Sequence, residues 1–205
     1  MSRTRSRPYA VAVAALLLFG RPAPAQEVRR FDMGFTPLAP AEAAADTRAF
    51  IRDNADLIAV PLAGGVPWTE AARHVGFHPY LYEDWTAKRS GRPDRGKLFL
   101  ALSPGRGELA DYRGEREGMP LPRKFRGKAF DDPEAGAAYL VYCREAVKFF
   151  KPDYLAIGID VDQIRTNYGV ERWRAYVKLH KHVYHELKST HRDLPIFVTV
   201  SLHTS

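Results

Sequence analysis

Bulky apolar side chains alternate with small or polar ones in five short stretches of the chain. Successive side chains of a β-strand point to opposite faces, so each stretch predicts a strand with one bulky apolar row and one small or polar row. The clearest bulky row lies within residues 154–162 and consists of Leu155, Ile157, Ile159 and Val161. The five predicted strands are residues 31–36, 57–65, 97–103, 154–162 and 196–204.

Four segments between these strands are predicted to be helical: residues 41–54, 79–89, 132–150 and 170–191. The third has the clearest start signal. Asp132 supplies a capping carboxylate, Pro133 has no N–H to leave unpaired, and Glu134 places an acid near the positive end of the helix dipole. An apolar stripe at spacings of three and four residues then predicts that this helix packs on the sheet.

The alternation of strand and helix favours right-handed crossovers between parallel strands. An open doubly wound sheet and a barrel both fit this order. Central strands of an open sheet are covered on both faces and should be apolar at nearly every position, whereas each strand here has a small or polar row. We therefore predict an α/β fold of the (β/α)8 TIM-barrel type, with strands 1 to 5 only. The first βα turn lacks the glycine fingerprint of a dinucleotide site, and we expect no cofactor.

The N-terminal segment has the pattern of a secretory signal peptide. Arginines at positions 3, 5 and 7 precede an apolar run over residues 10–19, and Ala23-Pro24-Ala25 offers small residues for cleavage. An uncleaved anchor is the alternative, but the run is much shorter than the roughly 20 residues that span a bilayer. We expect cleavage after Ala25, a secreted or periplasmic protein without a membrane partner, and a partial barrel over residues 26–205.

Composition and charge narrow the classes of partner. Removing residues 1–25 takes four arginines and no acidic residue, so the formal charge falls from +7 to +3. No basic helix concentrates that charge, which argues against nucleic acid as a partner. Cys143, the single cysteine, lies on the apolar stripe of a predicted helix and is interpreted as a core residue.

Two carboxylates, Asp160 and Asp162, stand at the end of the fourth predicted strand. Catalytic groups of a (β/α)8 barrel lie where strands end and βα loops begin, so this end of the sheet is the candidate site. The alternative is that both carboxylates cap the following loop or pair with Arg165. Two neighbouring carboxylates also raise the pKa of one of them, which suits a general acid.

Several stretches resemble the retaining glycoside hydrolases of the large (β/α)8 clan, nearest to the family 53 arabinogalactan endo-β-1,4-galactanase type. The stretches that carry the likeness are Phe31-Asp32-Met33-Gly34-Phe35, Asp56-Leu57-Ile58-Ala59-Val60, Gly64-Gly65-Val66-Pro67-Trp68 and Phe150-Lys151-Pro152-Asp153-Tyr154-Leu155-Ala156-Ile157-Gly158-Ile159-Asp160. The resemblance implies hydrolysis of β-linked, galactan-like plant polysaccharide, with Asp160 as the general acid/base.

The chain departs from the pattern of that clan at the catalytic position. The clan has Asn-Glu where this chain has Ile159-Asp160. The seventh-strand nucleophile of the clan has no counterpart among the five predicted strands, so we expect the 205-residue chain to be inactive by itself. Two hypotheses follow: a glycoside-hydrolase-like barrel, or a non-catalytic barrel that binds polysaccharide or oligosaccharide. We also expect self-association through faces that a complete barrel would cover.

Other polar or aromatic residues are predicted near strand ends and could bind substrate together with Asp162: Trp68, Asp32, Ser103, Ser201 and His203. Trp68 either stacks on a sugar ring or packs in the core. Residues 104–131 form a long basic connection, either a lid that favours an acidic or branched glycan or a solvated loop. His182 and His185 have a metal-like spacing, but they lie on an outer helix, and we expect no metal site.

Overall fold

The computed structural model describes residues 31–37, 44–92 and 96–202. Asp32–Ser205 forms one compact unit, and Met1–Phe31 forms another, of which only Phe31 is described. The predicted signal peptide and His203 therefore lie outside the described residues.

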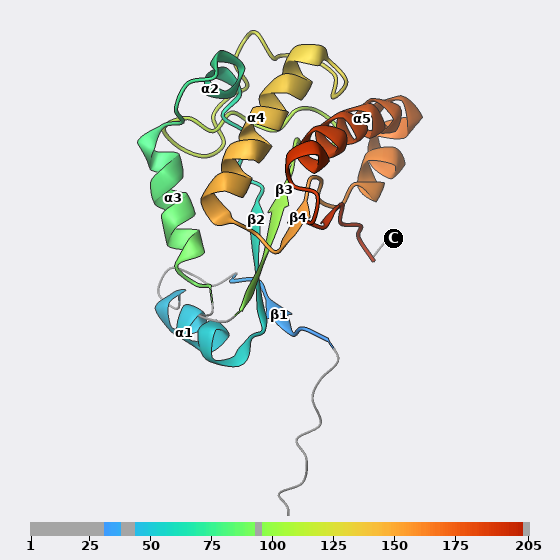
Figure 1. Ribbon diagram of the computed structural model, residues 1–205. Helices are drawn as coiled ribbons and strands as arrows, with labels where there is room; N and C mark the ends of the chain where they lie inside the picture. The colour runs from blue at the N-terminus through green and yellow to red at the C-terminus, as the bar shows by residue number, and fades with distance from the viewer. Residues whose placement is uncertain (1–30, 38–43, 93–95, 203–205) are drawn as a thin grey trace, which may run out of the picture. The chain divides into compact units, whose positions relative to one another are not determined.

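Five parallel strands in chain order form the sheet (Figure 1). They are β1 (Gly34–Phe35), β2 (Leu57–Leu62), β3 (Lys97–Leu102), β4 (Tyr154–Ala156) and β5 (Ile196–Phe197). The intervening helices are α1 (Ala44–Asn54), α2 (Trp68–Arg73), α3 (Pro79–Arg89), α4 (Pro133–Phe150) and α5 (Asp162–Thr190). The predicted α/β fold with alternating strands and helices is confirmed.

The strand order agrees with the barrel-type arrangement, one of the two architectures considered from sequence. A doubly wound sheet reverses its order at a switch point, whereas this sheet runs β1-β2-β3-β4-β5 without reversal. Right-handed crossovers that always step in one direction place their helices on one face of the sheet. This is the arrangement of consecutive strands in a (β/α)8 barrel.

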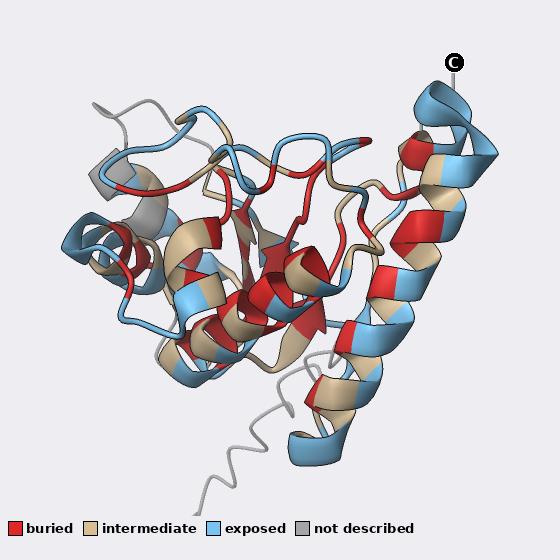
Figure 2. Cartoon of the chain, turned by 90° about the horizontal axis from the view of Figure 1, so that it is seen from above, coloured by how far each residue is buried: buried red, intermediate tan, exposed pale blue. Residues whose placement is uncertain are grey.

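The two faces of the sheet differ in burial, as the two-row pattern predicts. In the register of β2 and β3, Ile58 pairs with Leu98 and Val60 with Leu100, and all four side chains are buried. On the other face Phe99 is half-buried, and Phe197 is 38% exposed. Figure 2 shows buried residues on the strands and on the helix sides that face them. The core therefore lies between the sheet and its helices.

Helix α4 begins as its sequence signals predict. The Asp132 carboxylate accepts hydrogen bonds from the N–H groups of Glu134 and Ala135 at 2.9 and 3.1 Å. Cys143 is buried on the apolar side of this helix, and burial raises the pKa of its thiol. The thiol is thus a core group, as interpreted from the sequence.

The carboxyl end of β4 differs from the sequence prediction. The strand ends at Ala156 rather than at residue 162, and residues 157–160 bend towards α5. Asp160 has a left-handed backbone, with φ of 49°, so strand alternation cannot continue through it. The first turns of α5 were not predicted. Gly169, with φ of 86°, separates them from the predicted helix that follows.

Candidate functional site

A pocket of about 400 Å³ lies at the carboxyl end of the sheet. Ala63, Ser103 and Ile159 contribute to it from the ends of β2, β3 and β4. Tyr168 of α5 and residues 105–111 complete its lining. Ligands of parallel α/β folds bind at this end of the strands, so the pocket is the candidate site.

Ser103 is the predicted site residue that lines this pocket. It is buried, and its hydroxyl exchanges hydrogen bonds of 3.3 Å with the N–H and the carbonyl of Gly105. The hydroxyl therefore fixes the turn that begins the β3–α4 segment, residues 103–132. Its partners lie within its own turn, and its contribution to the pocket is to hold that turn in place.

Tyr168 and Arg172 bring α5 against the same turn. The ring of Tyr168 lies directly on Gly107, because a Cβ at that glycine would overlap the ring. Arg172 donates from Nη1 to the Gly107 carbonyl at 2.9 Å. Tyr168 is also 50% exposed and lines the pocket, so it offers an aromatic surface at the pocket rim.

Asp160 follows Ile159, the residue of the β4–α5 connection that lines the pocket. Its backbone N–H donates to the Thr199 hydroxyl at 3.0 Å, which fixes the turn. Within the described part of the chain, the Asp160 carboxylate has no hydrogen bond and no ion pair. Left-handed backbone at a non-glycine residue is uncommon, and such conformations cluster at functional sites.

Asp162 has a structural partner instead. Its Oδ1 accepts a hydrogen bond from the Ser201 N–H at 2.8 Å, while its Oδ2 is buried. Asp162 and Ser201, two predicted substrate-binding residues, are thus brought together, but as a link between the start of α5 and the chain after β5. The sequence predicted that Asp160 and Asp162 are neighbours on one face of a strand. The structure contradicts this prediction, because the strand ends before both residues.

Trp68 is fully buried at the start of α2. Its indole N–H donates to the Ala110 carbonyl at 2.8 Å, and its ring packs against Phe125. Of the two roles considered from sequence, the structure shows packing, since a ring without exposed surface cannot stack on a sugar. The contact anchors the β3–α4 segment next to the pocket.

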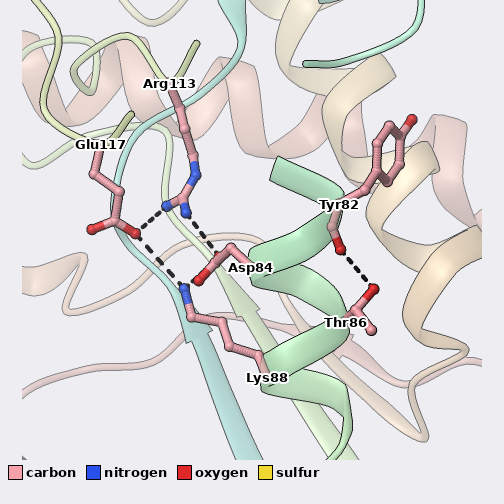
Figure 3. Close-up of polar contacts among 6 residues, drawn as sticks. All are labelled: Tyr82, Asp84, Thr86, Lys88, Arg113 and Glu117. Carbon is pink, nitrogen blue, oxygen red and sulfur yellow. Dashed lines mark hydrogen bonds and ion pairs between the residues drawn. The ribbon is translucent and has the colours of Figure 1, made fainter. Parts of the chain in front are cut away.

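A buried arginine within the segment, Arg113, also anchors it (Figure 3). Arg113 is 1% exposed and pairs with Asp84 of α3 at 2.8 Å and with Glu117. Lys88 contacts the same two carboxylates. A Cβ at Gly64 would overlap the Arg113 guanidinium, so this glycine makes room for the network. The segment is thus a cover that is packed around Arg113, while residues 115–118 are exposed.

Asp32 lies at the wrong end of the sheet for the predicted pocket. It precedes β1, and its carboxylate pairs at 2.7 Å with Lys97, the first residue of β3. Tyr154, the first residue of β4, accepts a bond from the same ammonium group at 3.3 Å. Asp32 therefore belongs to a polar cluster at the amino end of the strands and does not line the pocket.

Sequence reasoning did not single out four pocket residues that could contact a ligand, although it counted Arg106 among the basic residues of a possible lid: Arg106, Glu108, Asp111 and Tyr168. The first three belong to a connection without periodicity, so only its composition was informative. Tyr168 lies in the helical turn that replaced part of the predicted strand and loop.

Comparisons with known proteins add no relative: no family model matches the chain, and no curated protein or solved structure is significantly similar to it. Within the described ranges, no helix has the length and hydropathy of a membrane span. The described residues also contain no cluster of three or more His, Cys, Asp or Glu side chains arranged to hold a metal ion.

Proposed function

We propose that this protein is a glycoside-hydrolase-like barrel that acts on β-linked, galactan-like polysaccharide at the pocket described above. The observation that carries the proposal is the place of Asp160. Its unpaired carboxylate follows a pocket-lining residue at the carboxyl end of a parallel sheet in chain order. The resemblance to family 53 galactanases supplies the substrate class, and export with cleavage after Ala25 is part of the same proposal.

Asp160 takes the role of general acid/base in this proposal. A retaining hydrolase protonates the leaving oxygen with one carboxyl group and attacks the anomeric carbon with a second, about 5–5.5 Å away. Asp162 is not free to serve as the second group, because it holds the Ser201 N–H. Since no carboxyl group of the pocket is assigned the role of nucleophile, we expect the 205-residue chain to bind glycan without hydrolysing it.

A non-catalytic glycan-binding barrel is the second candidate. The Asp160 carboxylate is one C–C bond, about 1.5 Å, shorter in reach than the glutamate of the resembled clan. The preceding residue is Ile159 rather than asparagine. These two departures favour binding without turnover, while the pocket and the exposed Tyr168 ring serve either candidate.

Binding and hydrolysis of β-1,4-galacto-oligosaccharide separate the candidates. The assay uses the 205-residue chain and the product of the complete open reading frame, each with Asp160→Asn and with Asp193→Asn, an exposed acid in the turn after α5, as the control. Reducing sugar released by the complete product, and lost in Asp160→Asn alone, supports the enzyme. Binding without turnover in every protein supports the second candidate. Absence of binding contradicts both.

A further inference from the structure

Arg106 stands at the tip of a turn that has little freedom to move. Gly105 has φ of 134°, and a Cβ there would overlap the Glu108 carbonyl, so only glycine fits. The Ala110 N–H closes the turn by donating to the Pro104 carbonyl at 2.7 Å. The backbone on the amino side of Arg106 is therefore fixed.

The carboxyl side of Arg106 is fixed by α5. Gly107 is buried beneath the Tyr168 ring, and its carbonyl accepts the 2.9 Å bond from Arg172. Arg106 itself is exposed and lines the pocket. The turn thus presents one long cationic side chain at the pocket from a backbone held on both sides.

The charge of Arg106 is available for a ligand. Among the described residues its guanidinium has no hydrogen bond and no ion pair. Glu108, an acid lining the same pocket, is 3.6 Å from the Arg172 guanidinium, which offsets its charge. Asp111, the other acid of the lining, is exposed and can accept hydrogen bonds from sugar hydroxyls.

We propose that Arg106 binds the carboxylate of a uronic acid unit in the β-linked glycan. This inference rests on the proposed function, because it assigns the charge of a ligand bound at the same pocket. A planar guanidinium can donate two parallel hydrogen bonds to a carboxylate, and a fixed turn lowers the entropy lost on binding. A neutral glycan leaves this cation without a partner.

Calorimetric titration of the 205-residue chain tests the proposal with three probes. They are a β-1,4-linked glucuronate oligosaccharide, its neutral methyl ester and a β-1,4-galacto-oligosaccharide. We expect the glucuronate to bind about five- to tenfold more tightly than its ester. Arg106→Gln should abolish this preference, and Arg106→Lys should retain part of it because the charge stays while the planar fork is lost.

Arg116→Gln is the matched control, because Arg116 is an exposed arginine of the same segment that does not line the pocket. It should keep the full preference for glucuronate. Equal affinity for the glucuronate and its ester, with the galacto-oligosaccharide still bound, overturns the role of Arg106 and leaves the proposed function standing. If Arg106→Gln and Arg116→Gln reduced the preference for glucuronate equally, the preference would come from general charge attraction, and the role of Arg106 would also be overturned. Binding of none of the three glycans overturns both proposals.

Discussion

Gly158 lies where the chain leaves β4, and it has no room for a side chain. A Cβ there would overlap the hydroxyl of Tyr176, which is buried and has no hydrogen-bond partner in the described structure. We predict that Gly158→Ala lowers the free energy of unfolding by about 1–3 kcal/mol, because the added methyl group overpacks this contact. Chemical denaturation measures the change.

Tyr176→Phe supplies the control for that clash. Alone it should leave stability unchanged or raise it slightly, since it removes a buried hydroxyl that lacks a partner. Combined with Gly158→Ala it should restore part of the lost stability, because Val161 Cγ1 would still lie 2.7 Å from the added Cβ. An equal cost of Gly158→Ala in both backgrounds would show that the hydroxyl is not the obstacle.

The same contacts explain which site residues the sequence could predict. Asp160 was found because an alternating stretch ended in acids. The end of β4 at Ala156 was not predictable, since the Thr199 hydroxyl that fixes the turn lies far along the chain. Trp68 was ambiguous for the same reason, because Ala110 and Phe125 bury it from the β3–α4 segment.

At the scale of elements, the cap of α4 gives a pH-dependent prediction. The hydrogen bond from Lys128, 2.8 Å long, and the N–H groups of the first helical turn lower the pKa of Asp132. An acid whose pKa is lower in the folded protein than in the unfolded chain stabilises the fold at pH values above its unfolded pKa, which is about 3.9 for Asp. This stabilisation is lost as the pH falls through the pKa of the folded protein.

We therefore expect Asp132→Ala to lower the free energy of unfolding by about 1 kcal/mol at pH 7. The difference from the unaltered protein should shrink in strong acid, because the protonated Asp132 keeps a neutral capping oxygen but loses its charge. Asp132→Asn keeps a good capping group and loses only the charge, so it should cost less at pH 7. Urea denaturation between pH 2 and pH 7 measures both variants. A pH-independent cost of Asp132→Ala would contradict the assigned role of the carboxylate.

The packing of the β3–α4 segment could not be predicted from the sequence, although the helices on either side of it could. Helix α3 was predicted with its observed bounds, and α4 with its observed end, because capping and apolar spacing are local signals. Residues 104–131 have no such period, yet the structure packs them through the buried Arg113 and through Trp68. Ion pairs between distant elements leave no local pattern, so this cover could be recognised only as a long connection.

Trp68→Phe tests the anchoring of that segment. The change removes the indole bond to the Ala110 carbonyl while keeping an aromatic ring in the core. We expect about 1–3 kcal/mol of lost stability and faster tryptic cleavage after the exposed Arg116. Trp173→Phe on α5, whose ring is half-buried, is the control and should leave cleavage at Arg116 unchanged. Unchanged cleavage in Trp68→Phe would show that the indole bond does not hold the segment.

At the scale of the molecule, the sheet face opposite the helices remains partly uncovered in the described structure. Phe99 and Phe197 stack on it with ring centroids 5.4 Å apart, and Phe197 is 38% exposed. We expect concentration-dependent self-association through this face, because exposed apolar patches associate. Sedimentation velocity should show less association for Phe197→Lys than for Val75→Lys, a control at another exposed apolar residue. Purely monomeric behaviour at all concentrations would contradict this expectation.

We expect glycan to bind in the pocket at the carboxyl end of the sheet. Titration of the isotope-labelled chain with β-1,4-galacto-oligosaccharide, followed by backbone NMR, tests it most directly. We expect shift changes at residues 103–111, 159–160 and 168, which line or adjoin the pocket. A second pocket, of about 420 Å³ and lined in part by Pro133 and His182 of α4 and α5, is the internal comparison. Shift changes confined to that second pocket, or none at saturating glycan, would contradict the claim.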